Sequence, residues 1–155
     1  MAKQYWLLKS EPRSFSFDDL ARSPKRTTCW EGVRNYQARN LLREMKKGDE
    51  AIFYHSNASP PAAVGTVTIV REAYPDAYQF DRKSRYHDAS SDPENPRWLM
   101  VDVQYGAPFA RALSLPELRE QRALAKMELL RKGSRLSVQP VTPKEWRAVL
   151  RLAGS

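Results

Sequence analysis

The chain has 155 residues, the usual size of one compact domain, so we expect residues 1–155 to form a single domain. One cysteine and two histidines are too few for an internal disulfide or a structural zinc site, and we expect neither metal nor cofactor. The net charge of +8, concentrated in residues 1–50 and 106–155, favours a polyanionic partner. With no bilayer-length apolar run and no signal peptide, we expect a cytoplasmic protein without a membrane partner.

In the first half of the chain, the pattern predicts two strands and two helices. An aromatic and aliphatic run predicts a strand at residues 5–8, ended by a polar turn at 9–12. Ser16 is expected to cap a short helix, and Asn35 a longer one that ends before Gly48. A buried strand follows at residues 50–55. The longer helix should bury one stripe, formed by Ala38, Leu41, Leu42 and Met45.

The second half is predicted to hold two more strands, a long loop and two more helices. Alternating residues indicate strands at 64–70 and 98–105, separated by a long irregular excursion at 74–97. Ser114 and Thr142 each precede a proline and a glutamate, which marks a capped helix start. Short helices interleaved with strands predict the α+β class, built on a small curved sheet or barrel.

The sequence contains few residues that could form a catalytic site. Cys29 or Ser56 would need His55 as a base, but no nucleophile elbow surrounds either residue. Ser56 follows His55 directly, and neighbours in an extended chain point to opposite faces. The six glycines form no phosphate-binding loop. An enzyme that acts on a modified nucleotide, with His55 as acid or base, remains an alternative.

A binding site for a nucleic-acid base explains the polar and aromatic clusters better. A base offers a π face to tryptophan or tyrosine and an edge to short polar groups. Trp30 lies at a loop edge, whereas Trp6, Trp98 and Trp146 lie in strand or helix patterns that place them inside. The residues suited to a base are Trp30, Tyr54, Tyr86, Ser10, Asn35, His55 and Ser56. The basic residues suited to phosphates are Arg34, Arg39 and Arg43 on the longer helix, and Arg131, Lys132 and Arg135 around Gly133.

Several motifs together resemble the EVE domain family. The segment WEGVRNYQARN at residues 30–40 carries the resemblance, and YWLLKSEP at 5–12 and FYHS at 53–56 support it. Further matches are EAYPD at 72–76, PRW at 96–98, VDV at 101–103 and SRLSVQPV at 134–141. They follow one another in order along almost the whole chain, which makes the set specific and implies a single EVE domain over residues 1–155.

The resemblance implies a PUA-like fold, a small mixed β-barrel surrounded by short helices, and kinship with YTH domains. It further implies a non-catalytic module that recognises a modified base in DNA, most readily a modified cytosine, sometimes beside a restriction or defence partner protein. Because PUA-like folds often serve RNA, an RNA-binding module is the second alternative. Glu31 is expected either to accept a hydrogen bond from an exocyclic amine or to pair with an arginine. The pocket implied by the resemblance consists of Lys9, Ser10, Trp30, Gly32, Val33, Asn35, His55, Ser56 and Ser137, with Tyr54, Tyr86 or Trp98 as a second aromatic wall.

Overall fold

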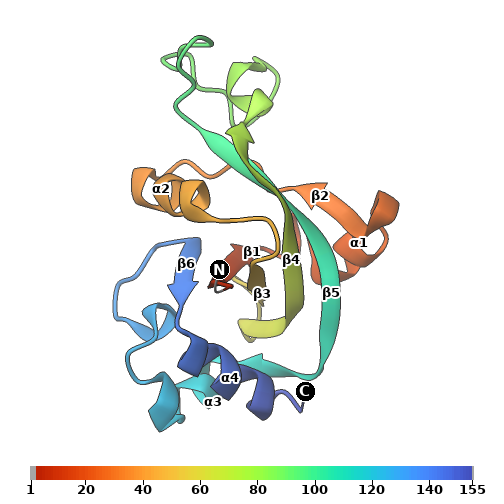
Figure 1. The fold of residues 1–155 in the computed structure, drawn as a ribbon, viewed down its shortest axis with the longest axis vertical. Coiled ribbons are helices and arrows are strands. Elements are labelled where there is room, and N and C mark those ends of the chain that lie inside the picture. The colour runs from red at the N-terminus through yellow and green to blue at the C-terminus, as the bar shows by residue number, and fades with distance from the viewer. Residues whose placement is uncertain (1–2, 155) are drawn as a thin grey trace.

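The computed structural model describes residues 3–154, in which six strands form one mixed sheet with the order β2-β5-β4-β3-β1-β6 (Figure 1). The strands are β1 (Tyr5–Ser10), β2 (Thr27–Cys29), β3 (Glu50–His55), β4 (Ala62–Pro75), β5 (Leu99–Ser114) and β6 (Val138–Val141). β1 runs parallel to β3, and all other neighbouring strands are antiparallel. The helices are α1 (Phe17–Ala21), α2 (Tyr36–Glu44), α3 (Leu115–Arg119) and α4 (Pro143–Leu152). The α+β class is confirmed.

The predicted helix starts are confirmed at their caps. Asn35 accepts a hydrogen bond from the Ala38 amide at the start of α2. Ser16 and Thr142 form complete capping boxes at α1 and α4. Ser114 caps α3, but the side chain of Glu117 pairs with Arg111 instead of returning to the cap.

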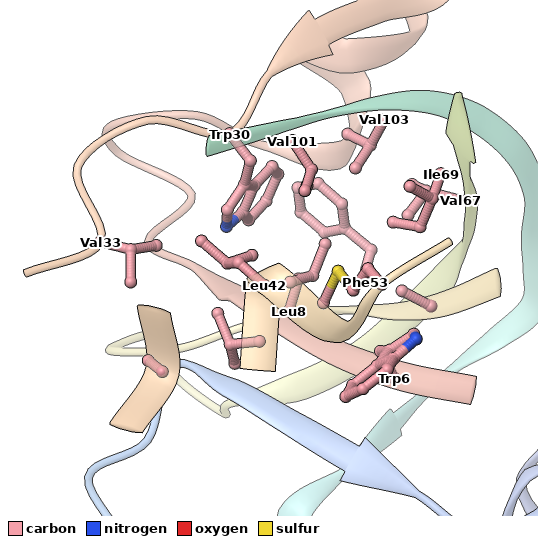
Figure 2. Close-up of a cluster of buried hydrophobic side chains, with 14 of the residues drawn as sticks. Trp6, Leu8, Trp30, Val33, Leu42, Phe53, Val67, Ile69, Val101 and Val103 are labelled. Atoms are coloured by element: carbon pink, nitrogen blue, oxygen red, sulfur yellow. The ribbon is translucent and has the colours of Figure 1, made fainter. Parts of the chain in front are cut away.

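Two hydrophobic clusters lie on opposite faces of the sheet, because residues alternate along β1 and β3. Trp6, Leu8 and Phe53 belong to the first cluster, which α1 and α2 cover. Leu7 and Ile52 belong to the second, which α3 and α4 cover. Figure 2 shows the first cluster, including two further labelled residues of β4, Val67 and Ile69. The sheet therefore separates two cores.

α2 bridges the two ends of the curved sheet. The helix packs against β6 at one edge, and against β4 and β5 toward the other edge (Figure 1). Its inward residues Ala38 and Leu42 are fully buried in the first cluster, as the helical spacing predicts. The small mixed barrel expected from the sequence is thus a curved sheet of six strands, counted over residues 3–154, whose gap is filled by a helix.

β4 and β5 extend beyond their predicted lengths. Both strands contain register shifts, and each shift resets the alternation of side chains. β5 therefore packs Val101 and Val103 into the first cluster but Phe109 and Leu113 into the second. Trp98, predicted to begin this strand, lies just before it. Bulges explain why a constant alternation identified only part of each strand.

Residues 76–98 form an excursion beyond the sheet, at the top of Figure 1. A fully buried side chain, Gln79, organises it. Its amide nitrogen donates to the carbonyls of Asp76 and Trp98, and its oxygen accepts from the Ser91 hydroxyl and the Trp98 amide. These four hydrogen bonds use the whole capacity of the side chain. Within residues 3–154, every helix is too short or too polar to traverse a bilayer.

Candidate functional site

A cavity of about 820 Å³ opens where the carboxyl ends of β1 and β3 meet the chain that leads into α2. Its volume falls within the range of about 300–1,000 Å³ typical of ligand pockets. Eight of the twelve residues predicted for base binding line it: Lys9, Ser10, Trp30, Gly32, Val33, Ser56, Tyr86 and Ser137. Five separate segments of the chain therefore meet here, and we call this space the large cavity.

The indole of Trp30 contributes to the large cavity from inside the core. Its side chain lies among the buried residues of the first cluster, close to Leu42 and Val101 in Figure 2, and meets the Phe53 ring edge-on at 5.5 Å. Only 7% of the residue is exposed. Trp30 thus directly follows β2 at the loop edge expected from the sequence, while its side chain is a core residue that also forms part of the cavity lining.

A buried carboxylate fixes the wall formed by residues 30–34. Asp76 is fully buried, and its Oδ2 accepts hydrogen bonds from the Gly32 amide at 2.9 Å and from Arg34 Nη1 at 3.0 Å. Its Oδ1 accepts from the Tyr78 amide. The Trp30 amide bonds to the Val101 carbonyl at 2.7 Å. Because several donors converge on one buried charge, the wall is held without regular secondary structure.

Gly32 is required where this wall meets Tyr86. Its φ is +85°, in the left-handed region that favours glycine. A Cβ atom at this position would approach the Tyr86 ring to 2.5 Å. The ring therefore packs directly on the main chain, and Arg34 and Arg85 lie over it with guanidinium carbons 5.4 and 4.9 Å from its centroid. Tyr86 is thereby placed as the second aromatic residue of the large cavity.

Short polar residues form the opposite side. The Ser10 hydroxyl donates to the Phe15 carbonyl, and the Ser56 amide donates to the Ser10 carbonyl. The Lys9 amide donates to the Ser137 carbonyl, which joins β1 to the segment before β6. Burial lowers the pKa of the Lys9 amine, and the charge of Glu128 partly opposes this shift. This side therefore presents serines and one half-buried amine.

Cys29 and Glu31 form an acidic spot in the large cavity. The Cys29 thiol donates to Glu31 Oε2 at 3.4 Å. Burial and the neighbouring carboxylate raise the pKa of Cys29 to about 12. The thiol is consequently protonated at neutral pH, the opposite of an activated nucleophile. Glu31 has the thiol as its partner instead of the arginine considered from the sequence.

Four predicted base-binding residues lie outside the lining. Tyr54 points to the other face of the sheet and is buried in the second cluster. His55 Nε2 accepts the Phe17 amide hydrogen at 3.1 Å, and burial lowers the pKa of its imidazole. Asn35 is used as the α2 cap. Trp98 stacks on Tyr36 and donates from its indole nitrogen to Asp88.

The arginines predicted to contact phosphates have different surroundings. Four of the five N–H donors of Arg34 are used, on Val33, Asp76 and twice on the Tyr86 carbonyl. Arg131 pairs with Glu128 at 2.9 Å, and Arg39 donates to the Arg97 carbonyl. Of the six basic residues suited to phosphates, the structure places only Arg135 in the lining of the large cavity, and Lys132 is exposed nearby in sequence.

Several residues that line the large cavity were not predicted from the sequence. The carboxylate of Glu11 accepts a hydrogen bond from the side-chain amide of Asn57, which ties the turn after β1 to the loop after β3. Arg13 and Phe15 follow that turn closely. The turn predicted at residues 9–12 was therefore the sequence feature that could have identified them as lining residues. Within residues 3–154, no cluster of three metal-binding side chains is found. The residues missed are Glu11, Arg13, Ser14, Phe15, Thr28, Cys29 and Arg85.

Comparisons with known proteins add independent findings. The model of the EVE domain family matches residues 4–152. Thymocyte nuclear protein 1 from Homo sapiens is 46% identical, over 96% of this chain and 73% of the relative. A crystal structure of the human THYN1 protein in complex with 5-methylcytosine-containing DNA has a TM-score of 0.94 and 45% identity, covering 99% of each chain. A protein from Pseudomonas putida has a TM-score of 0.92 and 47% identity, covering 96% of this chain and 99% of that one. The expected fold is confirmed by these matches.

Proposed function

The chain belongs to the EVE domain family, and we propose that it is a non-catalytic DNA-binding domain that takes a modified cytosine into the large cavity. The observation that carries this proposal is the cavity itself, which joins aromatic, short polar and basic side chains in one space of suitable volume. The human structure with 5-methylcytosine-containing DNA, related over 99% of this chain, supports the choice of base and of nucleic acid.

The lining can meet each part of a nucleotide. Trp30 and Tyr86 supply aromatic surface, on which stacking stabilises a bound base by about 1–3 kcal/mol. Extruding a base from a duplex costs a few kcal/mol, so selectivity must come from the edge contacts and from the modifying group. Within the described residues, Glu31 Oε1 accepts no hydrogen bond, so it is available to the exocyclic amine of a cytosine.

The positive rim suits the backbone that flanks the base. Lys9, Arg13, Arg85 and Arg135 line the large cavity, against two acids, Glu11 and Glu31. We assign phosphate contact at this rim to Arg135 and to the exposed Lys132. Arg34 has most of its donors bound to Val33, Asp76 and Tyr86, and we assign it to holding the wall.

Two features support the absence of catalysis at this site. The Nε2 of His55 is occupied by a main-chain amide, which leaves it unable to take a proton from a substrate there. The thiol of Cys29 has a pKa of about 12, which disfavours the thiolate that a nucleophile requires. The expected cytoplasmic location and a restriction or defence partner remain predictions.

Binding to matched DNA duplexes tests the proposal. The duplexes differ only in one cytosine, which is either plain or 5-methylated, and a matched RNA is measured beside them. Ser56→Phe places a ring in the large cavity, whereas Ala123→Phe places the same ring on the exposed turn η3 (Arg122–Leu124). We expect the parent and Ala123→Phe to prefer methylated DNA, and Ser56→Phe to lose that preference.

Three results would contradict the proposal. Equal affinity of the parent for plain and methylated DNA would show that the protein does not recognise the modified base. Tighter binding to the RNA would favour the RNA-binding alternative. Release of an altered base, abolished in His55→Ala, would establish an enzyme.

A further inference from the structure

A second hollow, of about 390 Å³, lies between α2 and the turn at residues 90–97 of the excursion. We call it the arginine groove, after the three arginines that line it: Arg39 and Arg43 from α2, and Arg97 from the excursion. Tyr36, the first residue of α2, lines it too and is 53% exposed. The exposed ring therefore gives the groove an aromatic surface and a hydroxyl group beside its arginines.

Two of the three arginines of the groove, Arg39 and Arg43, form no ion pair among the described residues. Arg97 pairs with Asp88 at 3.2 Å. Arg39 donates to neutral acceptors, the Arg97 carbonyl and the Asn40 side chain. Asp92 also lines the groove, where its carboxylate accepts the Glu94 amide.

A stack of side chains connects the arginine groove to the large cavity. The Arg34 guanidinium lies over both Tyr86, which lines the cavity, and Trp98, at 5.4 and 5.5 Å. Trp98 stacks on Tyr36 with centroids 5.0 Å apart, and Arg39 lies over Tyr36 at 5.0 Å. The contacts thus run from Tyr86 through Arg34 and Trp98 to Tyr36 at the groove. One continuous stack therefore joins the walls of the two hollows.

The spacing matches a short stretch of nucleic acid. Val33 lines the cavity and Tyr36 lines the groove, and three residues of extended chain span at most about 10 Å. One DNA strand advances about 3.4 Å per nucleotide. Counted between these nearest edges of the two hollows, a strand with one base in the large cavity would reach the groove with a phosphate about three nucleotides from that base.

We propose that the arginine groove binds a backbone phosphate of the DNA strand whose modified base occupies the large cavity. This inference rests on the proposed function. Arg43 and Arg39 supply the charge, and the Tyr36 hydroxyl supplies a further donor. Because phosphates carry no sequence information, the groove adds affinity equally for modified and plain DNA, while the cavity discriminates between them.

The salt dependence of binding tests this site. Arg43→Gln removes one exposed charge, and Arg147→Gln removes a matched exposed arginine on α4, outside both hollows. Each phosphate contact contributes a slope of about 0.9 to the logarithmic salt dependence for duplex DNA. Raising the salt from about 50 to about 200 mM weakens DNA binding by every form of the protein. We expect this salt-induced loss of affinity to be about threefold smaller for Arg43→Gln than for the parent. Arg147→Gln should behave as the parent.

The contact can be located with oligonucleotides in which single phosphates, one to three nucleotides from the methylated cytosine, are neutral methylphosphonates. At one position we expect the parent to lose affinity and Arg43→Gln to lose little more, because both changes remove the same contact. Additive losses at every position would overturn the groove, as would an unchanged salt slope in Arg43→Gln. The preference of the parent for methylated DNA is a separate readout. If the parent shows no such preference, the proposed function is refuted. If the parent shows the preference but the affinity losses from Arg43→Gln and from the methylphosphonates are additive, only the groove is refuted.

Discussion

The first and second clusters lie on opposite faces of the same sheet and are both covered by helices, but Trp30 and Val33 of the first cluster also line the large cavity. On the second face, α3 and α4 seal the sheet with apolar contacts, such as Trp146 stacked on Tyr5 at 4.4 Å. Beyond the first face, the wall of the large cavity is held by hydrogen bonds to buried Asp76 and Gln79. Apolar packing stabilises a face that needs no opening, whereas buried polar groups position loops around a cavity.

The largest effect on stability is expected on the second face. Trp146→Ala removes a buried indole from the second cluster, and such truncations cost about 3–5 kcal/mol of unfolding free energy. Urea unfolding measures this loss. Because Trp146 and the rest of the second cluster do not line the large cavity, the folded variant should keep the parental preference for methylated DNA. A lost preference in the folded variant would show that the two faces are not independent.

Asp76→Ala should combine a large stability loss with a binding defect. The substitution leaves Arg34 without its ion-pair partner and the amides of Gly32 and Tyr78 without their acceptor. Breaking a buried pair costs about 3 kcal/mol or more. We expect urea unfolding to show this loss and DNA titrations to show reduced discrimination. Glu94→Ala, an exposed change in the same excursion, should shift stability by less than about 0.5 kcal/mol. Full discrimination by Asp76→Ala would contradict its role in the wall.

Two glycines with positive φ separate backbone strain from cavity shape. Gly32→Ala and Gly133→Ala both place an alanine in the left-handed region, at a cost of about 1–3 kcal/mol each. Only at Gly32 would the new methyl group collide with Tyr86, because nothing lies within 4 Å at Gly133. We therefore expect Gly32→Ala alone to lose preference for methylated DNA. If both variants preferred methylated DNA equally, the contact between Gly32 and Tyr86 would not be needed for base recognition.

The smallest effect concerns pH. Burial lowers the pKa of His55 below its ordinary value of about 6.5. The unfolded chain therefore binds a proton more readily than the folded protein, so this contribution to stability is present above about pH 6.5 and is lost as pH falls below it. His55→Gln keeps an acceptor for the Phe17 amide but does not titrate. Between about pH 7 and 5 the parent should lose more unfolding free energy than His55→Gln. Equal losses of unfolding free energy in the parent and in His55→Gln would show that the pKa of His55 does not change on folding.

Local signals in the sequence predicted local structure well. The caps at Ser16, Asn35 and Thr142 depend on residues three positions apart, and all three are present. The strand at 50–55 was predicted with its observed bounds. By contrast, β2 and the distal halves of β4 and β5 depend on pairing between distant residues and on bulges, which a periodic pattern does not reveal.

The site was predicted in composition more than in geometry. The family resemblance brought together distant segments, including Ser10, Gly32 and Ser137. Tyr54 was misplaced because a single position in an extended strand decides which face a side chain occupies. The role of Asp76 had no local signal, since its partner Arg34 lies 42 positions away.

Fluorescence of 2-aminopurine tests most directly whether a base enters the large cavity. The probe is placed beside the methylated cytosine in the same strand, so that the cytosine stays paired with guanine. The probe loses a stacking neighbour and becomes brighter when the cytosine leaves the helix. The account predicts a rise in fluorescence with saturating parent protein, and none with saturating Ser56→Phe, whose added ring occupies the cavity. Saturated binding by the parent without any rise would contradict base extrusion into this cavity.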